Sequence, residues 1–295
     1  MRTYLTWFFN EFSYPEDGAA ALFEGYDRIY QNEDSARLFD DILQIYCDNF
    51  NCDYKNILTK CEEIVTLCGV HEYTVKLLAY ICLSRQLRTN YEARGLDLGI
   101  WFDSMCDLKY KLIECKLVKG IYGSFVADWF SRFFNMTRFA LGRLQFEIVP
   151  FRRNYQKDGK ILTPESPVIN VHIPRTETPL DEASRKDAYA RAREFYKADF
   201  EGKPMAFVCN SWLLFERHRE MLKPTANIIG FMNDFDIIEN KLNEPGAYSS
   251  AWRFFDMTIP EDLDALPEDS SLRRSYKALM KRGEPTGSGF GVFFA

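Results

Sequence analysis

The chain has 295 residues, 46% of them hydrophobic, so it is long enough for one large domain or two ordinary ones and apolar enough to bury their cores. Its 43 acidic side chains outnumber the 37 basic ones and give a net charge of -6, which works against binding to nucleic acid or to an anionic membrane. We therefore expect no nucleic-acid or membrane partner, and favour a small molecule or a protein partner.

The eight cysteines contain no Cys-x-x-Cys pair, so the sequence predicts neither a zinc site nor a disulfide framework. Free thiols are typical of a reducing compartment. No apolar run approaches the length of a membrane span. Asn10 and Glu11 interrupt the apolar residues at the start of the chain, which also lacks a small-residue cleavage site. These features predict a cytoplasmic protein without a metal.

Residues 18–139 follow the helical period throughout. Apolar side chains recur there at alternating spacings of four and three, as in Trp101, Met105, Leu108, Leu112 and Cys115. The segment CGVHEYTVKLLAYICLSRQL is apolar on nearly every side, which is typical of a helix enclosed by others. Because no strand pattern occurs in this half, we predict an all-helical domain over residues 1–140.

The period changes at LGRLQFEIVPF, where apolar and polar residues alternate as in a half-buried strand with one polar face. The apolar members are Leu144, Phe146 and Ile148, and the polar members are Arg143, Gln145 and Glu147. The dipeptide Asp158-Gly159 then predicts a tight hairpin turn, since both central residues of such a turn need positive φ. SPVINVHIP supplies a further strand, so a sheet is predicted to begin here.

A helix is predicted next in TPLDEASRKDAYARAREFY, with Thr178 as N-cap and Pro179 as the first helical residue. The strand MAFVC follows it, so the simplest topology is a right-handed parallel crossover. A helix in WLLFERHREML and a last strand in GFGVFFA continue the alternation. We predict a second, α+β or α/β domain over residues 141–295, a mixed sheet flanked by helices. Since no Gly/Pro/Ser-rich linker precedes it, we expect the two domains to share an interface.

Several short, separate segments of the sequence resemble those of a known family. They are GSFVADWF, TRFALGRLQFE, VHIP followed by PL, and AFVCNSWLL followed by NI, and the resemblance covers roughly Val70 to the C-terminus. It is to bacterial acyltransferase-domain proteins with a helical N-acyltransferase N-terminal domain and a GNAT-like C-terminal domain. The resemblance implies a GNAT-like sheet and transfer of an acyl group from an acyl-CoA-type thioester to an amine.

One loop departs from the usual GNAT pattern. GNAT enzymes that bind coenzyme A usually carry a glycine-rich loop, whose backbone N–H groups hold the diphosphate at a helix N-terminus. The corresponding segment here, PRTETPLDE, has no glycine, and its Glu177, Asp181 and Glu182 would repel a diphosphate. Arg175 and exposed N–H groups are the remaining donors for coenzyme A.

The candidate site lies at the ends of two strands. In a GNAT-like sheet, the strands VINVHIP and MAFVC run parallel and separate at their C-terminal ends, where the acyl-pantetheine arm enters. The resemblance therefore places His172 and the corner Cys209-Asn210-Ser211 beside one cleft. The implied roles are His172 or Glu147 as the base, Ser211 as the acid for the leaving thiolate, and Asn210, Cys209 and Arg175 as contacts to the donor.

Each of these residues also has a structural interpretation. Asn210 and Ser211 are good helix N-caps. His172 is equally compatible with a structural hydrogen bond, and Glu147 with the solvated face of its strand. Cys209 beside an imidazole suggests a nucleophile, but a cysteine that ends a buried strand more often packs as a small hydrophobe.

Two functions follow from these observations. The first is acyl transfer to an amine by direct attack on the thioester. The second is a GNAT-derived small-molecule or protein binding module that has lost catalysis, with the helical domain covering the cleft or recognising a protein. The acidic loop after His172 favours this second function.

Overall fold

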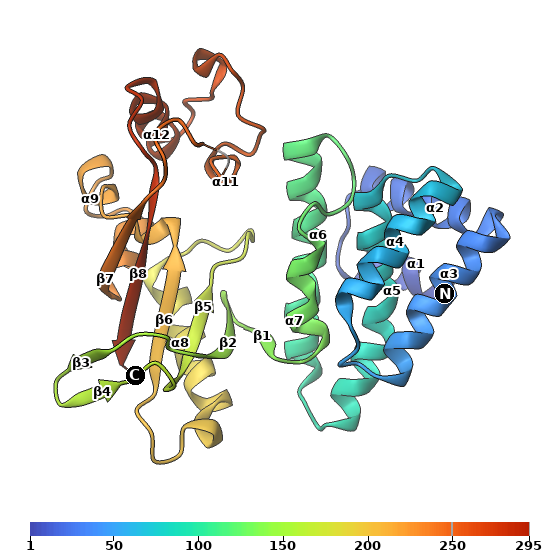
Figure 1. The fold of residues 1–295 in the computed structure, drawn as a ribbon, viewed down its shortest axis with the longest axis horizontal. Coiled ribbons are helices and arrows are strands. Elements are labelled where there is room, and N and C mark those ends of the chain that lie inside the picture. Colours follow the sequence, from blue (N-terminus) through green and yellow to red (C-terminus); the bar gives the residue numbers. More distant parts are fainter. Residues whose placement is uncertain (249, 295) are drawn as a thin grey trace. The chain divides into compact units, whose positions relative to one another are not determined.

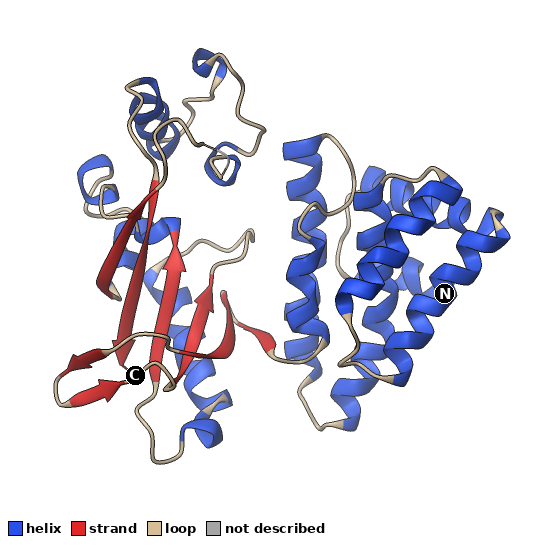
Figure 2. Ribbon diagram, in the orientation of Figure 1, coloured by secondary structure: helices blue, strands red, loops and turns tan. Residues whose placement is uncertain are grey.

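The computed structural model describes residues 1–248 and 250–294 and divides the chain into two compact units, Met1–Phe139 and Ala140–Ala295 (Figure 1). The first unit is built from helices, and the second from a sheet with helices around it (Figure 2). Within these described ranges, none of the helices combines the length and the apolar character that a membrane span requires.

The N-terminal unit is helical, which confirms the prediction. Every residue from 1 to 139 is described, and the long helices are joined by short connections. The elements are α1 (Arg2–Glu11), α2 (Glu16–Gln31), α3 (Glu33–Asp48), α4 (Tyr54–Cys68), α5 (Glu72–Ala93), α6 (Leu98–Lys119), the 3-10 helix η1 (Ala127–Phe130) and α7 (Ser131–Phe134).

The helix α5 is enclosed by its neighbours, as its apolar surface predicts. Twelve of its 22 residues are buried, from Thr74 to Tyr91. Its first turn is capped by His71, whose Nδ1 accepts a hydrogen bond from the Tyr73 N–H at 3.1 Å. Gly123 passes so close to this turn that a Cβ atom there would lie 2.3 Å from the Tyr73 carbonyl carbon. Only glycine allows this close passage.

The C-terminal unit contains a six-stranded mixed sheet with the order β1-β2-β5-β6-β8-β7. Its strands are β1 (Arg138–Leu141), β2 (Leu144–Pro150), β5 (Pro167–His172), β6 (Ala206–Ser211), β7 (Asp236–Leu242) and β8 (Gly287–Phe294). The β5–β6 pair is parallel, whereas the β2–β5, β6–β8 and β7–β8 pairs are antiparallel. The predicted mixed sheet and the parallel crossover are therefore confirmed.

The predicted hairpin at Asp158-Gly159 is present but stands outside the main sheet. Strands β3 (Tyr155–Lys157) and β4 (Lys160–Leu162) pair only with each other, and both turn residues have positive φ, 50° and 75°. Side chains tie the hairpin region to β7, since the Tyr155 hydroxyl donates to Asp236 Oδ2 at 2.7 Å. The hairpin lies between β2 and β5 in the sequence, but these two strands are neighbours in the sheet.

The crossover helix α8 (Glu182–Phe195) lies against one face of the sheet. Its Tyr189 ring is 5.6 Å from the Phe207 ring on β6 and 5.0 Å from the Phe293 ring on β8. A partly buried ion pair links α8 to the end of α10 (Asn227–Asn233), because Arg185 Nε donates to Asp234 Oδ2 at 2.6 Å. The opposite face carries a second apolar group, which includes Phe151, Leu162, Val168, Val208, Phe290 and Val292.

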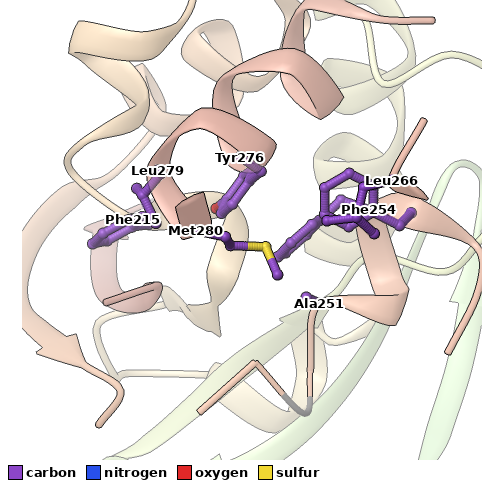
Figure 3. Close-up of a cluster of buried hydrophobic side chains, with 8 residues drawn as sticks. Phe215, Ala251, Phe254, Leu266, Tyr276, Leu279 and Met280 are labelled. Carbon is purple, nitrogen blue, oxygen red and sulfur yellow. The ribbon is translucent and has the colours of Figure 1, made fainter. Parts of the chain in front are cut away.

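Residues 243–286 form a long insertion between β7 and β8. Its described part contains α11 (Trp252–Phe255), the 3-10 helix η4 (Leu263–Ala265) and α12 (Ser271–Lys281). These elements have a core of their own, in which the Tyr276 and Phe254 rings stack 3.9 Å apart (Figure 3). Phe215 and Trp212, from the segment after β6, pack into the same core. The insertion therefore packs directly on the end of β6.

Two helix predictions are wrong in their bounds. The crossover helix begins at Glu182 rather than at Pro179, because the Asp181 side chain accepts the Ser184 N–H at 2.8 Å and so takes the capping role expected of Thr178. The segment after β6 is not one helix. It forms the 3-10 helix η3 (Trp212–Leu214) and the single turn α9 (His218–Met221), because its apolar side chains pack against the insertion core.

Candidate active site

Strand register brings four polar side chains of β2 and β5 to one face of the sheet. The antiparallel pair aligns Gln145 with His172 and Glu147 with Asn170. Because side chains alternate along a strand, residues two apart share a face. This is the face that carries Val168 and Val208, opposite the one that α8 covers.

His172 and Glu147 form a hydrogen-bonded pair. His172 Nε2 lies 2.7 Å from Glu147 Oε1, and Asn170 Nδ2 lies 3.2 Å from that nitrogen and 3.5 Å from that oxygen. The Glu147 side chain is 7% exposed and the His172 side chain 18%. Of the two interpretations of Glu147, the solvated strand face is therefore wrong, because this carboxylate is buried and bonded across the strand pair.

This pair lies next to the point where β5 and β6 stop pairing. The aligned residues of the two parallel strands are Ile169 with Phe207 and Asn170 with Val208. Each strand continues beyond them, β5 to His172 and β6 to Ser211. His172 and Asn210 are thus each two positions past the last aligned pair.

Ser211 forms a structural cap at the end of β6. Its Oγ accepts a hydrogen bond from the Leu213 N–H at 3.2 Å and so caps η3. Asn210 is exposed and aligned with Phe290 of β8. The capping role does not use the hydroxyl hydrogen of Ser211, so a role as proton donor is chemically compatible with it.

Cys209 lies on the other face of β6 from Asn210, since the two are adjacent in a strand. It is fully buried, and burial raises the pKa of its thiol well above the ordinary value. A raised pKa disfavours the thiolate that a nucleophile needs. The structure thus supports packing rather than nucleophilic attack for this residue.

Arg175 is paired with an acidic residue of the insertion. Both terminal nitrogens of its guanidinium bond Asp256, with Nη2 3.3 Å from Oδ2. Arg273 of α12 donates to the same Oδ2 at 2.8 Å. Two arginines from distant segments therefore share one carboxylate just after the end of β5. Neither partner was found from the sequence, because they follow Arg175 by about 80 and 100 residues.

The N-terminus of α8 is already occupied by the chain itself. Asp181 caps it, and Glu182 in its first turn pairs with Lys186. The hydrogen bond from the Ser184 N–H holds the pKa of the Asp181 carboxyl below its ordinary value, so this end carries a negative charge at neutral pH. Among the described residues, no group of three or more His, Cys, Asp or Glu side chains is placed to hold a metal ion.

Comparison with known proteins identifies the family. The chain matches a GNAT-like C-terminal domain over residues 139–293 and an N-acyltransferase N-terminal domain over residues 4–136. The chain belongs to this family. The GNAT-like acyltransferase family, its fold class and the acyltransferase activity predicted from the sequence are thereby confirmed. A search among curated proteins gives no match.

Solved structures share the architecture of this GNAT-like acyltransferase. One is an acyltransferase in complex with decanoyl-CoA and teicoplanin, with a TM-score of 0.72 and 20% identity over 97% of this chain and 86% of that chain. A complex with CoA and 10C-teicoplanin gives the same values. Another acyltransferase complex with decanoyl-CoA has a TM-score of 0.63 and 16% identity over 98% of both chains. At these identities the likeness concerns the fold.

Proposed function

We propose that this acyltransferase moves an acyl group from an acyl-CoA thioester to the amine of a small molecule, with the Glu147–His172 pair as the base. The observation that carries the proposal is the 2.7 Å hydrogen bond of this pair beside the end of the β5–β6 pairing. The fold neighbours support the substrate classes, because they were solved with decanoyl-CoA, CoA and teicoplanin.

The reaction requires one proton to leave the amine and one to reach the thiolate. The amine nitrogen attacks the thioester carbonyl, a C–N bond forms and the C–S bond breaks. When Nε2 of His172 donates to the Glu147 carboxylate, the ring lone pair is on Nδ1, which accepts the proton that the amine nitrogen loses as the C–N bond forms. Burial makes the Glu147 carboxylate a strong partner for the imidazolium that results.

The remaining predicted residues are proposed as contacts to the donor. Asn210 offers an exposed amide to the amides of the pantetheine arm. The Ser211 hydroxyl donates a proton to the departing thiolate and regains one from solvent before the next turnover. Arg175 uses two of its five N–H donors on Asp256, which leaves three for a phosphate. Cys209 contributes to this region by packing under the corner.

Binding and turnover test this proposal. A ligand at about a hundred times its Kd adds about 2.7 kcal/mol to the free energy of unfolding, so decanoyl-CoA should raise the melting temperature. Thiol release from decanoyl-CoA in the presence of amines measures turnover. Glu147→Gln and His172→Gln should each lower it by roughly a hundredfold, as expected for the loss of one acid–base group.

The matched control is His71→Gln, which changes an exposed histidine of the helical unit. It should have wild-type turnover. Wild-type turnover in both Glu147→Gln and His172→Gln would remove the pair from the mechanism. A melting temperature that is the same with and without millimolar decanoyl-CoA would contradict the proposed donor.

We also propose a cytoplasmic location. All eight cysteines are free, and none of them is paired in a disulfide. Free thiols persist in reducing compartments, which supports this location. A thiol count on protein isolated under non-reducing conditions tests it, with eight reactive thiols expected after denaturation.

A further inference from the structure

Asn170 lies between the two members of the proposed base. It is aligned with Glu147 across the β2–β5 pair and precedes His172 by two positions on β5, so all three side chains share one face. Its Nδ2 is 3.2 Å from His172 Nε2 and 3.5 Å from Glu147 Oε1, the two atoms joined by the 2.7 Å hydrogen bond. The amide therefore directs its NH2 group at the place where one proton is shared.

The NH2 group of an amide can only donate hydrogen bonds. In the proposed base, His172 Nε2 carries the hydrogen that it donates to Glu147 Oε1, and the ring lone pair is on Nδ1. The Asn170 NH2 group donates to the same carboxylate oxygen, so it shares the negative charge that would stabilise an imidazolium. Uptake of a proton at Nδ1 makes the ring a cation, and the NH2 group, the positive end of the Asn170 amide, lies beside that ring at Nε2. Asn170 therefore favours the neutral ring over the imidazolium.

The charged groups on the neighbouring strands and on the turn before β2 do not reverse this direction. On β2, Glu147 is itself the acidic member of the pair. At the same level β6 carries Val208 and Asn210, which have no charge. The turn between β1 and β2 carries Arg143, whose guanidinium donates to main-chain oxygens of the loop after β5. A nearby cation also opposes uptake of a further proton, so it acts in the same sense as Asn170.

We propose that Asn170 is a positioning residue that lowers the proton affinity of the Glu147–His172 pair and so keeps the base available near neutral pH. This inference rests on the proposed function for its catalytic meaning. Its physical content, a lowered proton affinity, is measurable without turnover.

The experiment is a histidine NMR titration of the full-length protein. The chain has only three histidines, and the His172→Gln variant identifies the His172 resonance. The variants are Asn170→Leu, which removes the donor and excludes water, and Asn170→Ser, which keeps a hydroxyl donor. Asn170→Asp adds a negative charge and serves as the positive control. Melting temperatures check that each variant is folded.

We expect Asn170→Leu to move the midpoint of the His172 titration toward higher pH by about one unit, the size of effect that one hydrogen bond to a charged group has. Asn170→Ser should move it less, and Asn170→Asp should move it more. The acid limb of the kcat/KM profile should follow the same order, with KM for the amine nearly unchanged. A midpoint in Asn170→Leu equal to that of the wild type, while Asn170→Asp shifts, overturns the inference.

Failure of the two proposals can be told apart. If His172→Gln has wild-type turnover, the proposed base is wrong, but the NMR midpoints still decide whether Asn170 lowers the proton affinity of the pair. If Asn170→Leu does not fold, the titration midpoints of Asn170→Ser and Asn170→Asp can still be compared with that of the wild type. Equal midpoints in Asn170→Ser, Asn170→Asp and the wild type then count against the inference.

Discussion

At the scale of single residues, His218 is a buried histidine whose protonation opposes folding. Its Nε2 lies 2.8 Å from the Tyr276 hydroxyl and its Nδ1 3.3 Å from the Leu213 carbonyl oxygen. Burial lowers the pKa of the imidazole from 6.5 to about 4. Since the unfolded chain binds a proton at this residue more readily, His218 favours the folded state only while it stays neutral.

This difference predicts an acid-sensitive free energy of unfolding. Above pH 6.5 the residue contributes no pH dependence. As the pH falls from 6.5 toward 4, the unfolded state gains the proton first, and the free energy of unfolding drops. Between pH 7 and pH 5 the loss from this group should be about 2 kcal/mol. Urea unfolding at the two pH values measures it. His218→Phe should have a correspondingly smaller difference, whereas Tyr276→Phe should keep most of it.

Ser211 allows a test that separates capping from chemistry. Ser211→Ala removes the acceptor of the Leu213 N–H and should cost about 0.5–2 kcal/mol of stability. Ser211→Asn should nearly restore that stability, because asparagine caps as well as serine. Asparagine has no hydroxyl proton, so turnover should remain roughly a hundredfold or more below the wild type if Ser211 protonates the thiolate. Wild-type turnover in Ser211→Asn would leave this residue as a cap alone.

At the scale of elements, the N-terminus of α8 shows how a cap is selected. Thr178 and Asp181 both have side chains that cap helices, and Thr178 is followed by a proline suited to a first helical turn. The cap forms at Asp181, three residues later, where Ser184 N–H is bound and Arg185 donates to the Leu180 carbonyl oxygen. The ion pair between the buried Arg185 and the partly exposed Asp234 fixes the helix at that position.

We expect Asp181→Ala to lower the melting temperature and Thr178→Ala to leave it nearly unchanged, because only the first substitution removes a helix cap. Asp181→Ser should recover most of the loss. Thermal unfolding followed by circular dichroism measures all three variants. A larger effect at Thr178 than at Asp181 would contradict the observed start of α8.

The contact between β8 and η3 depends on a glycine. A Cβ atom at Gly289 would lie 2.2 Å from the Leu214 carbonyl oxygen, which is main chain and cannot rotate away. Gly289→Ala should therefore cost about 2 kcal/mol or more, in the range of overpacked positions. Ser288→Ala, one position earlier in the same strand, is the matched control and should be nearly neutral. Urea unfolding compares the two, and a neutral Gly289→Ala would show that η3 moves freely.

At the scale of the whole molecule, the boundary between the two units along the chain falls inside β1. This strand runs from Arg138 to Leu141, and the division into units lies between Phe139 and Ala140. We propose the domain boundary at residues 140/141, as predicted from the change of period. A fragment cut there nevertheless loses most of the edge strand beside β2.

This arrangement predicts different behaviour for two fragments. Residues 141–295 should melt well below the intact chain, since β2 then becomes an unprotected edge. Residues 137–295 keep all of β1 and should melt at a higher temperature than the shorter fragment. Equal melting temperatures for both fragments would show that β1 contributes little. A fragment 141–295 as stable as the full chain would contradict the expected shared interface between domains.

The sequence by itself determined the order of elements. The helical period of residues 18–139, the alternation at Leu144–Ile148 and the Asp158-Gly159 turn are local signals, because each depends on residues a few positions apart. The same alternation placed Asn170 and His172 on one face of a strand. Family membership could also be predicted from the sequence, since short, separate segments carry the resemblance.

Only the tertiary structure decided which side chains meet. Glu147 bonds His172 because antiparallel register across β2 and β5 brings residues 25 positions apart to 2.7 Å, and a hairpin that leaves the sheet lies between them. Arg175 meets Asp256 because a long insertion folds back to the end of β5. No local pattern encodes these distances. Register and long loop closure are set by the packing of the whole unit, and the candidate base follows from that packing.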